Sequence, residues 1–255
     1  MKFKDLDQKM RVYETLNDRY ILPNMYIVAR LDGRGFTKLT KEIIPFEAPF
    51  DIQFKDYIVE TVKHLMNCGF NIVYGFTQSD EISLLLNIND NSFSRKERKY
   101  LSVLAGEASA KFSTMLGHVA TFDCRLSQLP NRKIVIDYFR WRNEDAHRNS
   151  LNAYCYWLLR KQGVNKTMAT KEIKGLSTSG KNELLFSLGV NYNDIPSWQK
   201  RGIGFYWKKV QVEKINPKTQ EQITVTRNTL HIEENLPLNT DYDNFLSQIL
   251  TSQIQ

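Results

Sequence analysis

Two aspartates that could hold metal ions lie about fifty residues apart in the chain. Asp32 follows an apolar run at residues 25–31 (MYIVARL), and Asp80 lies between two further strand-like segments. If those strands are neighbours in one sheet, the two carboxylates converge at its edge. A two-metal phosphoryl-transfer site requires such a pair, with ions ~3.5–4 Å apart that activate the attacking hydroxyl and steady the leaving group. The pattern therefore predicts metal-dependent phosphoryl transfer.

The residues next to these aspartates refine the prediction. Glu81 follows Asp80 directly, and consecutive side chains of a strand point to opposite faces, so we expect Asp80 to bind metal and Glu81 to assist it. Gly33 would let a backbone carbonyl approach an ion closely. Alternatively, residues 32–33 are a plain turn and residues 79–81 a polar hairpin tip. Each segment alone favours that interpretation, whereas the two together favour a site.

Cations for phosphate groups cluster at two places. Four of the five residues at 95–99 are Lys or Arg and open a predicted helix, where positive charge opposes the helix dipole at a cost of roughly 0.3 kcal/mol each. An anion bound there would offset that cost. Further cations flank the first aspartate, at Arg30, Arg34, Lys38 and Lys41. A solvated charged face is the alternative for either cluster.

The segment at 138–160 mixes aromatic, cationic and amide side chains on one predicted helix. His147, with Asn149 and Asn152 nearby, could bind an RNA end or a base edge. The aromatic residues of the same segment fit a core position equally well.

The elements that must position these residues follow the order strand, helix, strand, strand, helix, strand. Strands are predicted at 25–31, 71–76, 81–86 and 119–124, and helices at 51–68 and 94–116. Ser94 followed by Glu97 resembles a capping box, and Gly117 would end that helix. This order is the split βαβ, ferredoxin-like arrangement, on which many polymerases and cyclases build their palm.

The remaining segments complete an α+β fold with additional helices and a C-terminal β-hairpin. Further helices are predicted at 5–20, 137–161 and 181–188, and the hairpin at 207–213 and 222–227 around the turn Asn216-Pro217-Lys218-Thr219. No linker interrupts the chain. We therefore expect a palm-like catalytic domain at 1–136 and a helical and hairpin part at 137–255, packed together as one unit.

Composition narrows the class of protein. The chain has 255 residues, of which 42% are hydrophobic and 25% charged, and no apolar run approaches the ~20 residues that span a bilayer. We expect no membrane partner. The N-terminus shows no targeting segment, and the three widely spaced cysteines fit reduced thiols. A cytoplasmic protein is expected, with an organellar role left open.

The net charge of +7 is unevenly distributed. Residues 231–255 contain four acids and no Lys or Arg, so this tail carries −4 and the rest of the chain +11. A basic body suits a polyanionic partner such as nucleic acid or nucleoside triphosphates, although solubility alone would also account for it.

Four motifs together resemble the tRNA-His guanylyltransferase superfamily. They are Arg30-Leu31-Asp32-Gly33-Arg34-Gly35-Phe36, Tyr74-Gly75 with Gln78-Ser79-Asp80-Glu81, His147-Arg148-Asn149, and Lys181-Asn182-Glu183. Their order and spacing match over roughly residues 5–210. The resemblance implies a polymerase-like palm, two Mg²⁺ ions, and nucleotide addition to the 5′ end of a tRNA in the 3′→5′ direction, with ATP and GTP as substrates. It also implies a homotetramer.

The resemblance also implies roles for individual residues. Asp32 and Asp80 would be metal ligands with the Gly33 carbonyl, and Ser79 and Glu81 essential neighbours. Lys96 and Lys99 would match basic residues at the triphosphate, whereas Arg30, Arg34 and Lys38 are assigned to the triphosphate only by their position beside Asp32. His147, Asn149 and Lys181 would handle the tRNA and the nucleotide.

Some positions depart from the histidine-specific enzymes. Those carry HINN where this chain has residues 147–150 (HRNS), a histidine where it has Thr37, and a lysine near Ala48. The chain is more similar to the bacterial and archaeal "like-protein" branch, which extends 5′-truncated tRNAs by Watson–Crick templating. Two other hypotheses stay open: another palm-type nucleotidyltransferase or cyclase, and a non-catalytic RNA-binding protein. The intact carboxylates disfavour the last.

Overall fold

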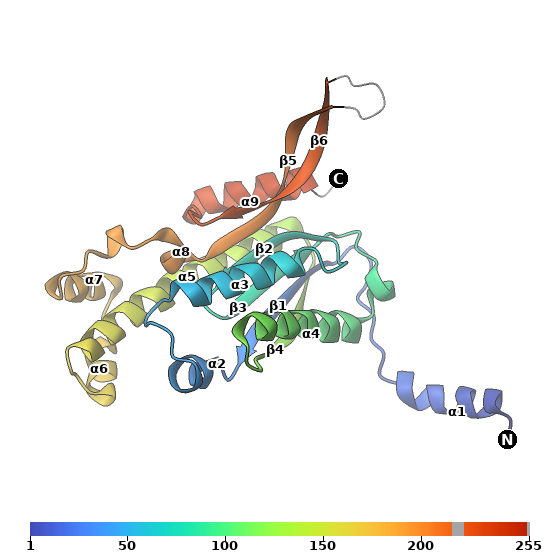
Figure 1. The fold of residues 1–255 in the computed structure, drawn as a ribbon, viewed down its shortest axis with the longest axis horizontal. Coiled ribbons are helices and arrows are strands. Elements are labelled where there is room, and N and C mark those ends of the chain that lie inside the picture. The colour runs from blue at the N-terminus through green and yellow to red at the C-terminus, as the bar shows by residue number, and fades with distance from the viewer. Residues whose placement is uncertain (216–221, 254–255) are drawn as a thin grey trace.

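The computed structural model describes residues 1–215 and 222–253, and it combines helices with an antiparallel sheet (Figure 1). The strands are β1 (Tyr26–Arg34), β2 (Ile72–Gln78), β3 (Glu81–Leu86), β4 (Thr121–Leu129), β5 (Ile203–Ile215) and β6 (Gln222–Glu233). The main helices are α1 (Phe3–Thr15), α3 (Ile52–Leu65), α4 (Glu97–Leu116), α5 (Arg132–Lys161), α6 (Lys166–Ile173), α7 (Thr178–Ser187) and α9 (Asn239–Gln253). Shorter helical segments are α2 (Phe36–Lys38), η1 (Leu39–Ile43), η2 (Ser92–Arg95), η3 (Tyr192–Asp194) and α8 (Ser197–Arg201).

The sheet brings the two predicted carboxylate segments side by side. Its strand order is β4-β1-β3-β2-β5-β6, and each neighbouring pair is antiparallel. β3 therefore lies directly beside β1, and Asp32 is opposite Glu81 in their register. The order of strands and main helices along residues 25–129 is the one that the sequence predicts, and residues fifty positions apart meet at one end of the sheet.

Helices cover both faces of the sheet, because successive side chains of β1 point to opposite faces and both sets are apolar. Ile27, Ala29 and Leu31 belong to a core with α3 and α4, whereas Tyr26 and Val28 pack with α5 and α9 on the other face. Each large apolar side chain so buried contributes about 1.5–3 kcal/mol. A strand with both faces covered reads as a continuous apolar run, which is what residues 25–31 are.

Aromatic rings fill the core beneath the carboxylate end of the sheet. Phe36, directly after β1, packs with its ring centroid 5.2 Å from that of Phe112 on α4 and 5.0 Å from that of Phe122 on β4. This cluster fixes the backbone that follows Asp32. On the opposite face, the hydroxyls of Tyr74 and Tyr242 are 2.9 Å apart, which ties α9 to β2.

Three details differ from the sequence-based predictions. β1 continues through Asp32 to Arg34, where a loop was expected. The capping box at Ser94 is wrong: α4 begins at Glu97 after Lys96, and Ser94 has φ 54° in η2. Helices α6 and α9 were not predicted. The predicted turn at residues 216–219 lies outside the described residues.

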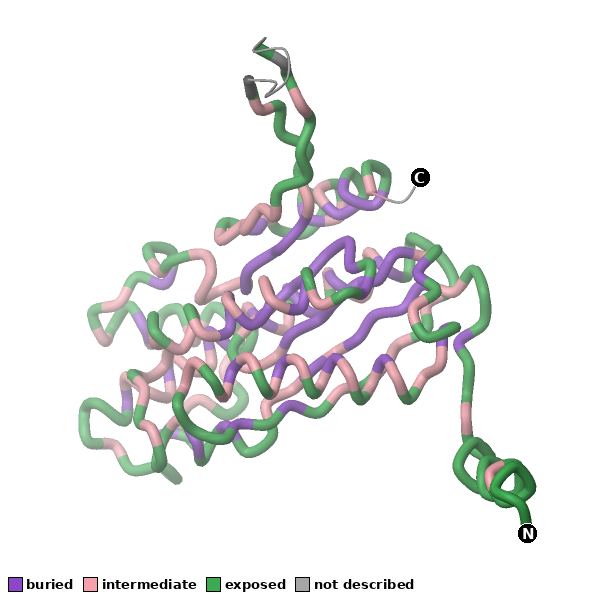
Figure 2. Tube along the Cα trace, turned by 45° about the vertical axis from the view of Figure 1, so that its right-hand side comes forward, coloured by how far each residue is buried: buried purple, intermediate pink, exposed green. Residues whose placement is uncertain are grey.

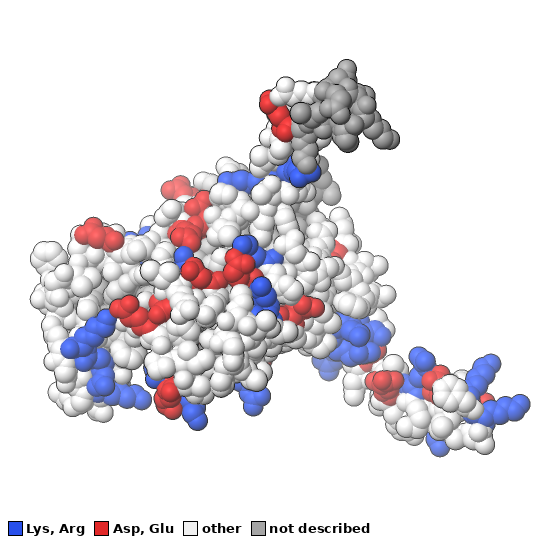
Figure 3. Space-filling model, in the orientation of Figure 1, with Lys and Arg blue, Asp and Glu red and all other residues white. Residues whose placement is uncertain are grey.

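Two segments project from the body. Helix α1 has no buried residue and stands apart at the N-terminal end, while β5 and β6 extend beyond the sheet (Figures 1 and 2). Figure 3 shows charges of both signs on α1. Among residues 1–215 and 222–253, no helix combines the length and apolar composition needed to cross a membrane.

Candidate active site

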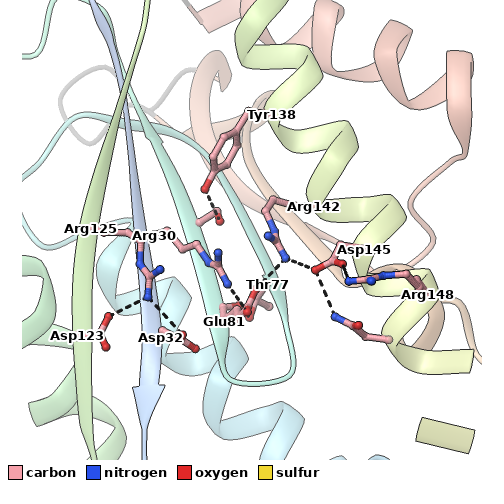
Figure 4. A network of polar contacts seen from close by, with 12 residues as sticks. Arg30, Asp32, Thr77, Glu81, Asp123, Arg125, Tyr138, Arg142, Asp145 and Arg148 are labelled. Atoms are coloured by element: carbon pink, nitrogen blue, oxygen red, sulfur yellow. Dashed lines mark hydrogen bonds and ion pairs between the residues drawn. The ribbon is translucent and has the colours of Figure 1, made fainter. Parts of the chain in front are cut away.

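Asp32 lies within β1 between two other polar strand positions. It is opposite Glu81 on β3 and opposite Asp123 on β4. Arg125, two residues after Asp123, places its guanidinium 3.6 Å from the carboxylates of both Asp32 and Asp123. The strand register thus places acids from β1, β3 and β4 at one end of the sheet, and Arg125 of β4 lies beside two of them (Figure 4).

Asp80 occupies the two-residue connection between β2 and β3. Gln78 pairs with Glu81, so Ser79 and Asp80 form the tip, and Ser79 adopts φ 55° to close it. The Asp80 carboxylate lies against the backbone of Gly33. A Cβ at position 33 would stand 2.8 Å from Asp80 Oδ2 and 2.5 Å from the Phe36 ring, so only glycine permits this approach. Asp80 is therefore held beside the backbone that directly follows Asp32.

The Asp80 carboxylate is an unfavourably placed charge. Burial raises its pKa to about 6, and the negative charges of Asp32 and Glu81 add to the effect, while hydrogen bonds from its own backbone and from Ser79 oppose it. Like charges that converge in a partly dry environment disfavour ionisation. A bound cation would relieve this repulsion.

The donor set at this position fits a hard divalent cation. It consists of two aspartates and the backbone around Gly33, all oxygen donors of the kind that Mg²⁺ prefers, and Mg²⁺ commonly takes one or two carboxylates and keeps several waters. Within residues 1–215 and 222–253 no group of three or more His, Cys, Asp or Glu side chains could hold a metal. A cation held here would take the two aspartates and complete its coordination with water or ligand oxygens.

Glu81 lies on the same face of the sheet as Asp32, its register partner, and is held by two arginines (Figure 4). Arg30 Nη2 donates to its Oε1, and Arg142 Nη2 donates to its Oε2 at 3.1 Å. The Thr77 hydroxyl donates to the Glu81 carbonyl at 2.7 Å. Both carboxylate oxygens are therefore engaged, and Arg30, which the sequence assigned to triphosphate, contacts Glu81.

The polar network continues along α5. Arg142 also donates to Asp145 at 2.5 Å, and Asp145 in turn accepts from Arg148 and from the Asn149 amide at 3.3 Å. These arginine partners hold the pKa of Asp145 below its ordinary value although burial raises it. Sequence reasoning missed Arg142 and Asp145. Their i, i+3 spacing on a predicted helix was the available signal.

A pocket of about 240 Å³ opens beside Asp80. Ser79 and Asp80 form part of its wall, and several aromatic rings line the rest. The lining rings are Phe36, Phe46, Phe50, Phe54, Trp157 and Trp198. Lys41 contributes to the rim, with its ammonium 5.3 Å from the Trp157 ring centroid. An aromatic cavity next to carboxylates suits a purine base whose phosphates reach toward the acids.

The predicted basic residues divide between two places. Arg34 and Lys38 are exposed at the end of β1 and on α2, close to Asp32 in sequence. The structure does not bring Lys96 and Lys99 to this site. Lys96 pairs with Asp18 at 2.8 Å at the start of α4. Phe112, on the same helix, reaches Phe36, so Lys99 lies about 20 Å from the carboxylate end along α4.

His147, Asn149 and Lys181 line the helical part of the molecule. Burial lowers the pKa of His147, and Arg201 and Lys200 add to that effect. The His147 ring centroid is 5.6 Å from that of Tyr192. Lys181, on α7, is half-buried. The Cys155 thiol donates to the backbone carbonyl of Lys181, with Sγ 3.6 Å from the oxygen. Of the three, Asn149 joins the network that reaches Glu81.

Comparisons with known proteins agree along the chain. Residues 7–130 match the tRNAHis guanylyltransferase family model, and residues 133–243 match the model of its C-terminal domain. The tRNA(His) guanylyltransferase of Debaryomyces hansenii is 30% identical over 85% of this chain and 88% of its own length. That of Schizosaccharomyces pombe is 34% identical over 76% of this chain and 77% of its own length.

Solved structures are similar in fold as well. A bacterial tRNA(His) guanylyltransferase-like protein in complex with ATP has a TM-score of 0.75 at 26% identity, covering 96% of this chain and 98% of its own. The crystal structure of the Saccharomyces cerevisiae tRNA(His) guanylyltransferase has a TM-score of 0.71 at 28% identity, covering 76% and 90%. By its two matched segments and its identity to these relatives, the chain belongs to the tRNAHis guanylyltransferase family.

Proposed function

We propose that this protein is a nucleotidyltransferase that adds nucleotides to the 5′ end of a tRNA, in the 3′→5′ direction and under the control of a template base. The observation that carries the proposal is the approach of Asp80 to Asp32 and Gly33, together with the aromatic pocket that Asp80 lines. The palm-like character of the sheet rests on its strand order and on this placement of the acids. Membership of the family supports the choice of substrate.

In this proposal the side chains act by positioning and by charge. Two Mg²⁺ ions held by the two aspartates and the Gly33 carbonyl would activate the attacking hydroxyl and neutralise the leaving phosphate. The pocket holds the purine of ATP or GTP between aromatic rings, and Lys41 with Lys38 and Arg34 approaches the triphosphate from its exposed side. The 3′-hydroxyl of the incoming nucleotide then attacks the activated 5′ phosphorus, and the activating group leaves with its electron pair.

The tRNA would approach along α5, with His147, Asn149 and Lys181 on that side of the molecule. We propose a domain of residues 1–136 for chemistry and a part at 137–255 for RNA, packed as one unit. We also propose a homotetramer, and α1 supports it because Phe3, Leu6, Met10 and Tyr13 form an exposed apolar stripe with heptad spacing. Light scattering of the intact chain measures the assembly.

Template control follows from what this chain lacks. An enzyme that selects one base without a template needs dedicated polar groups that go unpaired with the wrong base. The histidine-specific enzymes differ from this chain at Thr37, Ala48 and Ser150, within the motifs that handle nucleotide and tRNA. Thr37 and Ala48 line the pocket. This chain keeps the acids and lacks these groups. That combination fits an enzyme in which Watson–Crick pairing with the template selects the added base.

The decisive experiment incubates the protein with a 5′-truncated tRNA, ATP, GTP and the other nucleotides. The opposing template base is varied through all four identities, and the extended 5′ ends are sequenced. We expect the added base to follow the template. Incorporation of G opposite every base would refute templating, and the absence of any extension would refute the activity itself.

A further inference from the structure

Arg142 is a buried cation that the proposed chemistry does not yet use. Its side chain is 4% exposed, although it projects from the middle of α5 toward the end of the sheet. One nitrogen, Nη2, donates to Glu81 at 3.1 Å and to Asp145 at 2.5 Å. A guanidinium removed from water is retained only where such partners compensate it, and here one partner lies beside Asp80.

Glu81 is fixed at three points. Arg30 from β1 holds one carboxylate oxygen and Arg142 from α5 holds the other, while Thr77 from β2 donates to its carbonyl. Glu81 is the first residue of β3, so its position determines where the two-residue tip of Ser79 and Asp80 ends. Arg142 is the one of these partners that comes from outside the sheet.

We propose that Arg142 is a positioning residue for nucleotidyl transfer: by holding Glu81 against Arg30 it fixes the start of β3 and thereby the direction of the Asp80 carboxylate. The inference rests on the proposed function and extends it to a residue of α5. Arg142 acts through Glu81, and Asp145 holds Arg142 from its other side.

The charges at the site explain why the loss would matter. Without Arg142, one oxygen of Glu81 loses its partner while the negative charges of Asp32 and Asp80 stay close by. Glu81 would then move toward Arg30 or away from the acids, and the connection between β2 and β3 would follow. Displacement of a catalytic group by ~1 Å lowers turnover about 100-fold without a matching loss of substrate binding.

The chain offers a matched control on the same helix. Arg140 also bridges two acids, with Nε 2.8 Å from Glu144 and Nη1 3.0 Å from Asp243 on α9. It ties α5 to a neighbouring element as Arg142 does, and its partners lie outside the active site. An arginine that only holds α5 in place should therefore behave like Arg140 when it is replaced.

The experiment measures kcat and KM for the nucleotide in Arg142→Met, Arg142→Lys and Arg140→Met, each corrected for its folded fraction by near-ultraviolet circular dichroism. We expect Arg142→Met to lower kcat about 100-fold with KM within about twofold of the wild type. Arg142→Lys should recover at least about tenfold of that loss, because one ammonium can donate to both acids as Nη2 does. Arg140→Met should stay within about twofold. Equal effects of Arg142→Met and Arg140→Met would overturn the inference.

A double-mutant cycle supplies a readout that does not depend on the folding of Arg142→Met. In a Glu81→Gln background, Arg142→Lys should cause no further loss of kcat, because the carboxylate that it positions is gone. Independent, multiplicative losses would contradict the inference while leaving the proposed activity intact. A wild-type protein that extends no tRNA would overturn the proposed function, and the role assigned to Arg142 with it.

Discussion

The two ends of the central sheet both contain buried arginines and acids, yet they treat charge differently. At the end where α4 begins, Arg95 donates to the carbonyls of Ile21, Met25, Ile88 and Asp90. Asp90 there accepts from the Tyr100 hydroxyl at 2.5 Å. At the other end, Asp32 and Asp80 repel each other, and Arg125 pairs with Asp32 at 3.6 Å.

This difference separates stability from function. A buried polar cluster with every group paired stabilises the fold, and breaking it is costly. A cluster of like charges beside a pocket lowers the stability of the fold. Such a cluster is the usual sign of a site that receives a charged ligand. Replacements at the two ends should therefore have opposite signatures, and three predictions test this.

The largest effect is expected at the carboxylate end. Asp32→Asn and Asp80→Asn should each lower nucleotide addition by about 1000-fold or more, because a ligand of both metal ions is lost. The metal-free Asp80→Asn protein should be as stable as the wild type or more stable by about 1 kcal/mol, since a buried repulsive charge is removed. Extension assays and urea unfolding measure the two quantities. Near-normal activity in either variant would contradict the metal-site assignment.

At the opposite end the signature should reverse. Arg95→Met leaves four backbone carbonyls without their donor and should destabilise the fold by about 3 kcal/mol, while the folded protein keeps kcat within about twofold. Arg98→Met is the matched control: Arg98 is an exposed partner of Asp18, so its replacement should leave the free energy of unfolding close to that of the wild type. Urea unfolding followed by circular dichroism gives both values. A larger loss of activity than of stability in Arg95→Met would break the comparison.

The smallest effect concerns Lys96 and Lys99. Lys96 and Lys99 lie at the end of the sheet where α4 begins. If one chain builds the whole site, Lys96→Ala and Lys99→Ala should each change the KM for nucleoside triphosphate less than about twofold. Lys41→Ala, at the rim of the pocket, should raise it by about fivefold. Steady-state assays over a range of ATP or GTP concentrations measure this. A large rise for Lys99→Ala would mean that a second copy brings its α4 to the triphosphate.

Much of the fold follows from local sequence patterns. The apolar run at 25–31 predicts β1, and Asp51 caps α3 where the helical spacing begins, with its carboxylate accepting from the Phe54 amide at 2.9 Å. Gly117 ends α4 in the left-handed conformation, as its position predicts. These features depend on residues close together in sequence, and they place Asp32 on β1 and Asp80 directly before the neighbouring strand β3.

The failures arise where distant residues decide the local structure. Ser94 does not cap α4 because the burial of Arg95 against carbonyls as far away as Ile21 pulls residues 93–95 into positive φ. The sequence did not predict α9, because its apolar residues are buried only by packing against β2 and α5, which are distant in sequence. Likewise, the pair between Arg142 and Glu81 joins residues 61 positions apart, which no local period reveals.

The construction of the pocket from both halves of the chain has a consequence for its synthesis. Phe46 and Phe54 lie in the first family-matched segment, whereas Trp157 and Trp198 lie in the second. Trp198 leaves the ribosome about 150 residues after Phe46, which at roughly 10 residues per second is about 15 seconds later. The nascent chain therefore exposes an incomplete aromatic wall throughout that interval, and the pocket is complete only after Trp198 has been made.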